Sequence, residues 1–144
     1  MTRALLDATV VIAAVDRDDS DHVAGFDILQ GVDHGKLPTG VIVSDALHEI
    51  LNFIEERKGH AVAVDVLDRL VRGEHFELPY NPKQNYATAR SLFRSNERLN
   101  FGDALQVAFT QRQGIEYVYS FDDDFDSVDG VRRLNSSVDP FDPD

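Results

Sequence analysis

The sequence predicts a single α/β domain in which helices flank a parallel sheet, and three observations support this. Short apolar runs rich in β-branched residues alternate along the chain with amphipathic segments of helical periodicity. Strands separated by helices indicate parallel pairing with right-handed crossovers. The length of 144 residues suits one domain with one sizeable core, and no internal repeat or linker divides it.

Five elements are expected in the first half of the chain. They are a buried strand at 4–7 (ALLD), a helical segment at 9–15, a helix at 20–30, a β-branched strand at 39–44 and an amphipathic helix at 44–59. On the helix at 20–30, Val23, Phe26 and Gln30 share one side. The helix at 44–59 has Ser44 or Asp45 as its expected capping residue.

Six elements are expected in the second half. They are a helix at 61–73, a short extended piece at 76–79, a helix from Pro82 to 98, a helix at 101–114, a strand at 116–120 and a short edge strand at 131–134. Asn100 is the expected cap of the fourth of these, and Gly114 ends it. Residues 135–144 form a polar, Pro-containing tail that we expect to be loosely ordered, which bounds the domain at 1–134.

The chain is acidic and contains no cysteine. Its net charge is -12, and its basic residues are mostly Arg. An acidic, Lys-poor surface is typical of halophilic proteins, because molar salt screens repulsion between surface acids. The absence of Cys excludes disulfides, thiolate catalysis and Cys-based zinc sites, and favours a cytoplasmic protein.

No membrane segment or export signal is expected. No apolar run approaches the roughly 20 residues that span a bilayer. The apolar N-terminal stretch carries Asp7 and continues into DRDDSDH without a small-residue cleavage site, so it is interpreted as a buried strand and turn.

Four acidic residues, far apart in sequence, each lie beside a hydrophobic segment. They are Asp7 in ALLDATVVI, Glu49 in ALHEILNFI, Asp103 in NFGDALQVAF and Asp122 in YVYSFDDDF. A buried carboxylate needs a partner, and a divalent cation is the simplest partner that several of them can share. Because ligand sites of open α/β sheets gather at the carboxyl ends of strands, Asp7 and Asp122 are candidates for a common site.

Each acid also has a purely structural interpretation. Asp7 could cap the helix that follows it, although Thr9 could take that role instead. Asp103 suits the first turn of a helix through the helix dipole. Asp122 belongs to a dense acidic loop that lacks the spacing of a calcium-binding EF-hand. Helical phase alone places Glu49 away from the apolar stripe and toward solvent.

In this order, the four contexts resemble the PIN domain and, within it, the VapC-type toxin ribonucleases. The matching pieces are LLDATVVI, LHEIL, LNFGDAL and YSFDDDF followed by GVRRL, and they extend from residue 3 to about residue 134. The resemblance implies a Rossmann-like, PIN-like sheet. It maps the family's acidic quartet onto Asp7, Glu49, Asp103 and Asp122, the small hydroxyl positions onto Thr9 and Ser120, and a further acid onto Asp124, which rivals Asp122 as the fourth ligand.

The resemblance also implies an activity and partners. The activity is that of an endoribonuclease dependent on Mg²⁺ (or Mn²⁺), in which Asp7, Asp103 and Asp122 hold the metal. Glu49 would orient or deprotonate the attacking water, or help to hold a second ion. The partners implied are an RNA substrate, a small antitoxin protein and a second copy of the chain in a homodimer.

Three arginines are candidates for RNA binding. Arg90, Arg94 and Arg98 recur at i, i+4 and i+8, so they are expected to share a helix face next to LNFGDAL. Phosphate contacts come from Lys and Arg, and this face would supply them in an otherwise acidic protein. A solvated helix face is the alternative interpretation.

Other functions remain open at this point. A PIN-like nuclease could act in RNA processing or decay without a toxin role. An acidic cation-binding or interaction module could lack catalysis altogether. A haloacid-dehalogenase-type phosphatase is more distant, because position 9, where a second Asp would be needed, is Thr.

Overall fold

The computed structural model, which describes residues 2–142, contains a five-stranded sheet in which all neighbouring strands are parallel. The strands lie in the order β3-β2-β1-β4-β5. Their bounds are Arg3–Leu6 (β1), Thr39–Val41 (β2), Phe76–Glu77 (β3), Tyr117–Tyr119 (β4) and Arg132–Leu134 (β5). The predicted parallel α/β architecture is therefore confirmed, and β1 is its central strand.

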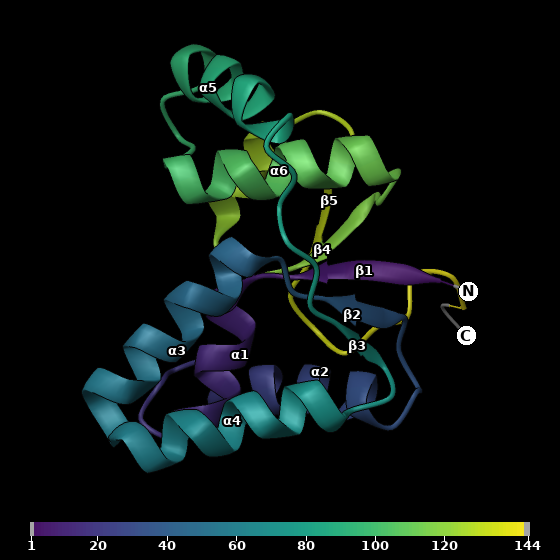
Figure 1. Cartoon of the computed structure of the whole chain (residues 1–144). Helices are drawn as coiled ribbons and strands as arrows, with labels where there is room; N and C mark the ends of the chain where they lie inside the picture. Colours follow the sequence, from purple (N-terminus) through teal and green to yellow (C-terminus); the bar gives the residue numbers. More distant parts are fainter. Residues whose placement is uncertain (1, 143–144) are drawn as a thin grey trace.

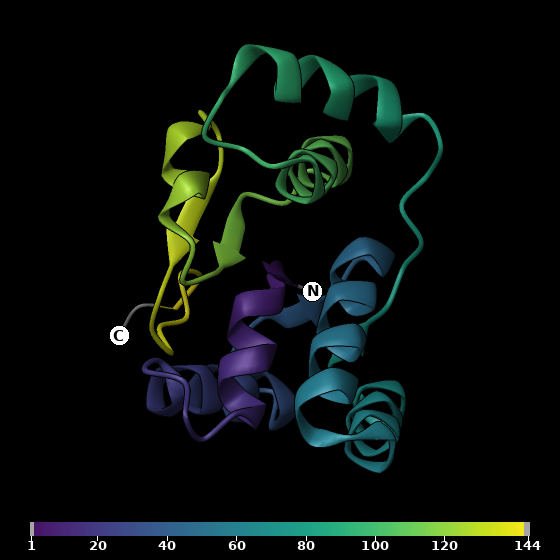
Figure 2. The ribbon, with the colours of Figure 1, turned by 90° about the vertical axis from the view of Figure 1, so that its left-hand side faces the viewer.

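Helices cover both faces of this sheet. They are Ala8–Val15 (α1), His22–Asp33 (α2), Ser44–Lys58 (α3), His60–Arg72 (α4), Asn85–Ser95 (α5), Phe101–Gln113 (α6) and the short 3-10 helix Asp123–Ser127 (η1). Figures 1 and 2 show α1 to α4 on one side of the sheet and α5 and α6 on the other. Among the described residues, no helix combines the length and the apolar composition that crossing a membrane requires.

The sheet separates two hydrophobic cores. Leu6 belongs to the core under α1 to α4, whereas Leu5 packs with Val118 and Phe109 on the α6 side. Successive side chains of a strand point to opposite faces, so β1 contributes to both cores. This explains why residues 4–6 of β1 form an uninterrupted apolar run and not an alternating one.

α2 buries one side and exposes the side that carries Val23 and Phe26. Gly25, Ile28 and Val32 are buried, whereas Val23 is 72% and Phe26 is 46% exposed. Val23 and Phe26, which were predicted to share one side of this helix, therefore both lie on the surface.

Close packing of α2 on α1 determines which side of α2 is buried. A Cβ atom at Gly25 would lie 2.9 Å from both the Cβ of Ala13 and the carbonyl oxygen of Val10. Only glycine permits this approach of the two helices. The glycine side of α2 is thus turned toward α1, because no other side can come as near.

The start of α3 is not capped as predicted. Val43 occupies the N-cap position, and Ser44 is already the first helical residue. The Ser44 hydroxyl instead accepts a hydrogen bond from the backbone N–H of Asn81 (3.1 Å), and the Asp45 carboxylate accepts one from the Asn81 side chain (2.9 Å). Both residues therefore join α3 to the segment that leads into α5.

The helix predicted from Pro82 begins later, and the one after it begins as predicted. Pro82 lies in a turn before the helix, where its carbonyl oxygen accepts a hydrogen bond from the backbone N–H of Asn85, the first residue of α5. The Asn100 side chain caps α6 by accepting from the backbone N–H of Asp103 at 2.7 Å. Gly114 ends α6 in the left-handed conformation, with φ of 68°.

The segment after β5 returns to the sheet. The Tyr119 hydroxyl donates to the carbonyl oxygen of Val138 (2.7 Å), and the Phe141 ring meets the edge of Tyr117 at 5.3 Å between centroids. The domain boundary at residue 134 and the loose order of the tail stay predictions.

Candidate active site

Asp7 lies at the end of β1, the strand at which the strand order of the sheet changes direction. β2 and β3 lie on one side of β1, and β4 and β5 lie on the other. Asp7 directly follows β1, and Ser120 directly follows β4, whose Tyr119 pairs with Leu6. Ligand sites of parallel α/β folds form at such a switch point, outside the carboxyl ends of the strands.

The Asp7 carboxylate is buried and hydrogen-bonded rather than used as a helix cap. Its side chain is 3% exposed and makes no capping hydrogen bond to α1. Thr9 Oγ1 donates to Asp7 Oδ2 at 2.7 Å, and Ser120 Oγ donates to the same oxygen at 2.8 Å. These donors compensate the cost of burying the charge.

The same two hydroxyls attach the acidic loop to Asp7. Thr9 Oγ1 accepts from the backbone N–H of Phe121 (3.1 Å), and Ser120 Oγ accepts from the backbone N–H of Asp122 (3.0 Å). Each hydroxyl therefore donates to Asp7 and accepts from the loop after β4. The position of Asp122 relative to Asp7 is set by two side chains that the sequence had marked as supporting residues.

Gln106 is a further member of this arrangement that sequence reasoning missed. It is 2% exposed, and its Nε2 donates to Asp7 Oδ1 at 3.0 Å. A long amide in the middle of the apolar run ALQVAF, one helical turn after Asp103, was the available signal.

Asp103, Asp122 and Asp124 converge. Each offers a carboxylate oxygen, and these three oxygens lie within 4.8 Å of one another. Asp103 is 6% exposed, and its Oδ2 is buried without a hydrogen-bond partner among the described residues. Three oxygen donors, one of them unsatisfied, fit a hard divalent cation such as Mg²⁺.

The charges of the acids act on one another. Burial, together with the charges of Asp7, Asp122 and Glu49, raises the pKa of Asp103 from its ordinary value of 3.8 to about 7. Burial, with help from the charges of Asp124 and Asp7, also raises the pKa of Asp122. Such mutual repulsion is relieved when a cation binds between the carboxylates.

Glu49 lies on α3 at the edge of this group. Its side chain is exposed, as helical phase predicts. Partial burial of its carboxyl group and the charges of Asp7 and Asp122 nevertheless raise its pKa. Glu49 is thus electrostatically coupled to the acidic group without being among the three acids that converge most closely.

The three candidate arginines do not share one helix face. α5 ends at Ser95, and Arg98 lies in the turn beyond it. Asn96 ends the helix there, because its side chain accepts from the backbone N–H of Arg98 (3.0 Å) and donates to Ser127 Oγ (2.9 Å). The prediction that the three arginines share a helix face is therefore wrong for Arg98, whereas Arg90 and Arg94 are both exposed on α5.

Two arginines hold the loop that carries Asp122 and Asp124. Arg98 Nε lies 3.3 Å from Asp124 Oδ1, and its Nη2 donates to the carbonyl oxygen of Asp123 at 3.0 Å. Arg133 binds both oxygens of Asp126 at 3.0 Å and donates to the carbonyl oxygen of Ser120 at 3.2 Å. Both contacts favour one conformation of the loop.

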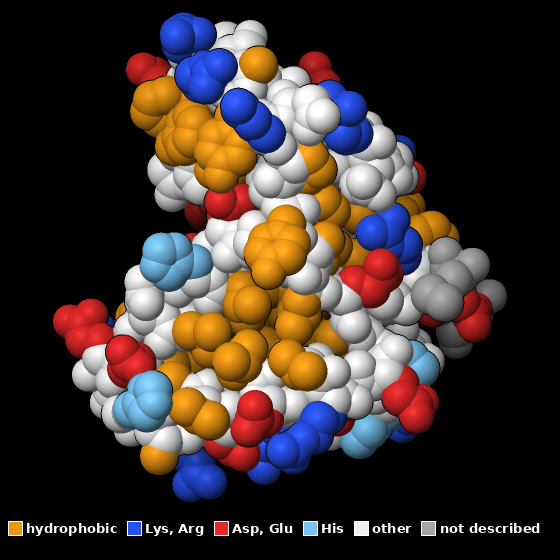
Figure 3. All heavy atoms as spheres, viewed as in Figure 1, with side chains coloured by type: hydrophobic (Ala, Val, Ile, Leu, Met, Phe, Trp, Pro, Cys, Tyr) orange, Lys and Arg blue, Asp and Glu red, His pale blue; other side chains and the backbone are white. Residues whose placement is uncertain are grey.

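Figure 3 shows a notch in the surface between the part of the molecule built on α5 and α6 and the part built on α3 and α4. Acidic side chains lie along this notch, and β1 runs toward it from the N-terminus.

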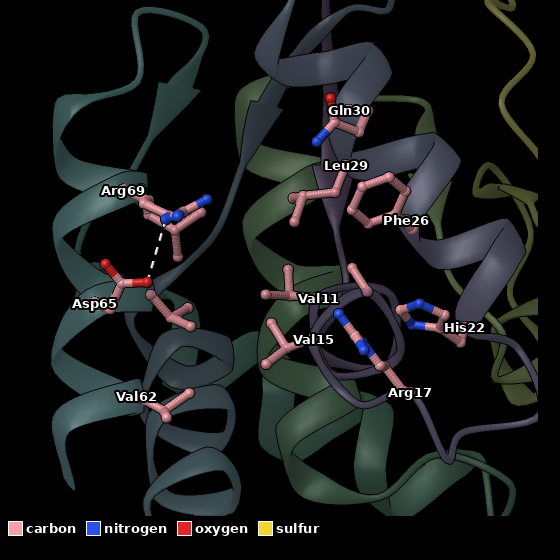
Figure 4. A pocket seen from close by; sticks show the side chains of 13 residues that line it. Val11, Val15, Arg17, His22, Phe26, Leu29, Gln30, Val62, Asp65 and Arg69 are labelled. Carbon is pink, nitrogen blue, oxygen red and sulfur yellow. Dashed lines mark ion pairs between the residues drawn. The ribbon is translucent and has the colours of Figure 1, made fainter. Parts of the chain in front are cut away.

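A separate apolar groove lies on the far side of α1. It has a volume of about 580 Å³ and is formed by α1, α2 and α4. Figure 4 shows Val11, Val15 and Leu29 between α4 on one side and α2, with Phe26, on the other. Asp65 and Arg69 pair at the rim with 3.2 Å between Oδ2 and Nε. Phe26 and Leu29 are the apolar side chains that α2 contributes to this groove.

The carboxylates that converge at the switch point of this parallel sheet form an acidic site, whose oxygen atoms are of the kind that binds a divalent cation. A family model described as PIN domain matches residues 4–131. The chain belongs to the PIN domain family, which confirms the resemblance and the PIN-like fold. No curated protein sequence is similar enough to count as a match.

Solved structures of toxins share this fold. Mycobacterium tuberculosis VapC20, described as a Sarcin-Ricin loop cleaving toxin, is 23% identical with a TM-score of 0.73, over 86% of this chain and 93% of that one. VapBC2 from Rickettsia felis, bound to a DNA fragment from its promoter, is 14% identical with a TM-score of 0.70, over 93% and 98%. DNA-bound VapBC from Salmonella typhimurium is 15% identical with a TM-score of 0.66, over 93% and 98%.

Proposed function

We propose that this protein is a Mg²⁺- or Mn²⁺-dependent endoribonuclease and the toxin of a toxin–antitoxin pair. The observation that carries the proposal is the convergence of Asp103, Asp122 and Asp124 beside the hydrogen-bonded Asp7 at the switch point of a PIN domain. The similarity in fold to VapC20, which is described as a Sarcin-Ricin loop cleaving toxin, supports RNA as the substrate class.

Several of the acids would bind the cation together. Asp7, Asp103 and Asp122 are the proposed ligands, and Asp124 is the alternative to Asp122 or an additional one. The cation would supply Lewis-acid stabilisation of the phosphate and would make water more acidic. Because the pKa of Asp103 is about 7, occupation of the site would release a proton from this carboxyl group near neutral pH.

Glu49 is the proposed general base. It is the exposed member of the quartet, so water and RNA can reach its carboxylate. Its raised pKa brings it nearer to the operating pH, which suits a group that accepts a proton from attacking water. The products would carry a 3′-hydroxyl and a 5′-phosphate.

Arg90 and Arg94 are the proposed phosphate contacts. Both are exposed at i and i+4 on α5, and none of the ion pairs between described residues involves them. Arg98 is engaged with Asp123 and Asp124, so any contact it makes with RNA would compete with these acids.

The activity is tested directly with purified protein and defined single-stranded and hairpin RNAs. We expect cleavage with Mg²⁺ or Mn²⁺, no cleavage in EDTA, and recovery when the ion is added back. Because the surface is acidic, the assay is run at low and at molar KCl. Equal cleavage in EDTA and in Mg²⁺ would contradict the proposed chemistry.

The apolar groove formed by α1, α2 and α4 is the proposed antitoxin site. A structure from Klebsiella pneumoniae that shares the fold is described as a toxin-antitoxin complex. A groove lined by Val, Leu and Phe with an Asp and Arg rim fits an amphipathic segment of a small partner. The groove is separate from the acidic group, so partner binding and RNA cleavage can be tested independently.

Replacing Phe26 with aspartate is expected to weaken partner binding by about a hundredfold, because it puts a charge in an apolar groove. The protein is co-expressed with the product of a short open reading frame adjacent to its gene, and co-purification is measured. Phe93→Asp is the matched control, since Phe93 is 48% exposed against 46% for Phe26 and lies on α5, outside the groove. Equal co-purification of both variants would show that this groove is not the docking site.

A homodimer and the toxin role itself rest on the family resemblance. Val64, Leu67 and Val71 recur along one side of α4 and are exposed or half-buried. Figure 3 shows hydrophobic side chains gathered over this helix, a surface that a second copy could cover. A PIN-like nuclease of RNA processing or decay, without a toxin role, is the alternative that the same acidic group allows.

A further inference from the structure

Gln106 connects α6, the helix that carries Asp103, to Asp7. It lies on α6, one helical turn after Asp103, and its side chain reaches Asp7 on the other side of the switch point. At 2% exposure it is as buried as the apolar residues around it. A buried amide in a helix that could have carried Leu or Ile at this position needs a physical explanation.

The hydrogen bonds of Asp7 show what Gln106 contributes. Asp7 Oδ2 accepts from both Thr9 and Ser120. A carboxylate oxygen has two acceptor sites, so Oδ2 is fully used. Among the described residues, Gln106 is the only side chain that donates to Oδ1. Oδ1 therefore keeps one acceptor site, and the amide of Gln106 determines where it points.

The other end of the amide also indicates a ligand. Gln106 Oε1 is buried and has no hydrogen-bond partner within residues 2–142, and the same is true of Oδ2 of Asp103 on the same helix. The amide cannot simply be turned around, because Oε1 would then face the negative Oδ1. Two unsatisfied buried acceptors beside a carboxylate with a free acceptor site are what a hydrated divalent cation would satisfy.

We propose that Gln106 is a positioning residue that holds Asp7 so that its Oδ1, and not its Oδ2, binds the divalent cation. The inference rests on the proposed metal-dependent function and adds to it the particular oxygen and the group that orients it. Groups that orient metal ligands typically contribute 10- to 100-fold to metal affinity or activity.

Gln106→Met tests this, because Met keeps the length and flexibility of Gln and removes the N–H donor. The Mn²⁺ affinity of the full chain is measured by calorimetry, and thermal unfolding is measured in EDTA. Thr110→Val is the matched control: Thr110 is also 2% exposed on α6, and its hydroxyl donates to the carbonyl oxygen of Val107 instead of to the site.

We expect Gln106→Met to bind Mn²⁺ about tenfold or more weakly, with an unfolding temperature in EDTA close to that of Thr110→Val. Mn²⁺ affinity within twofold of the wild type would overturn the inference. If Gln106→Met folds poorly, Gln106→Leu is measured in the same way and read by the same criterion.

Failure of the proposed function gives a different result. A wild-type protein that binds Mn²⁺ but cleaves no RNA contradicts the nuclease and leaves the affinity comparison to decide the role of Gln106. A wild-type protein that binds no Mn²⁺ overturns both.

Discussion

Replacing Asp7 with asparagine is expected to lower the rate of RNA cleavage about a thousandfold, equivalent to roughly 4 kcal/mol of lost transition-state stabilisation. The substitution removes the negative charge proposed to hold the cation and keeps the shape of the side chain. The fold should survive, because the new NH2 group replaces only one carboxylate oxygen: either the hydroxyls of Thr9 and Ser120 rotate to accept from it, or the Gln106 amide turns so that its oxygen accepts from it.

Single-turnover cleavage of a defined RNA in Mg²⁺ measures the effect, with circular dichroism as the check on folding. Asp123→Asn is the matched control, since Asp123 belongs to the same acidic loop but its carboxylate is 75% exposed and outside the converging group. That control should retain activity within about threefold, as surface substitutions usually do. A folded Asp7→Asn protein with wild-type activity would refute the assignment of the site.

The metal-free protein is expected to become less stable as the pH rises, by roughly 2 kcal/mol between about pH 5 and about pH 8. The pKa of Asp103 is about 7 in the folded protein and lies near 3.8 when the carboxyl group is exposed. The folded state therefore holds the proton more tightly than the unfolded state. Its stabilising effect is complete below about pH 3.8 and is lost as the pH rises to about 7.

Urea unfolding in EDTA at several pH values measures this slope. The raised pKa values of Asp122 and Glu49 act in the same direction. Asp103→Asn should flatten the slope and make the metal-free protein more stable at about pH 8, even though it removes a proposed ligand. A slope that is unchanged by Asp103→Asn would show that this carboxyl group is not the cause.

The strand and helix ends that carry Asp7, Asp103 and Asp122 could be predicted because local patterns determine them. The apolar runs ALL and YVY mark β1 and β4, and Asn100 caps α6 as its sequence indicates. The exposed position of Glu49 also followed from helical phase. Its coupling to Asp7 and Asp122 did not, because it depends on how α3 packs beside the sheet.

The features that the sequence did not reveal depend on contacts between distant segments. The buried face of α2 is selected by the approach of Gly25 to α1, which the apolar pattern of α2 alone cannot indicate. α5 stops before Arg98 because the side chain of Asn96 binds Ser127, 31 residues away. Gln106 could be recognised only once Asp7, 99 positions earlier, had been placed against it.

The order of the strands has a consequence for synthesis on the ribosome. The neighbouring strands β1 and β4 come from the beginning and from the last part of the chain. Two of the proposed acids belong to the first half of the chain and two to the second half. While only the segment through α4 has been made, Asp7 and Glu49 are present without Asp103 and Asp122. A nascent or truncated chain therefore lacks the proposed nuclease site, and activity would appear only after β4 and the acidic loop have emerged and joined β1.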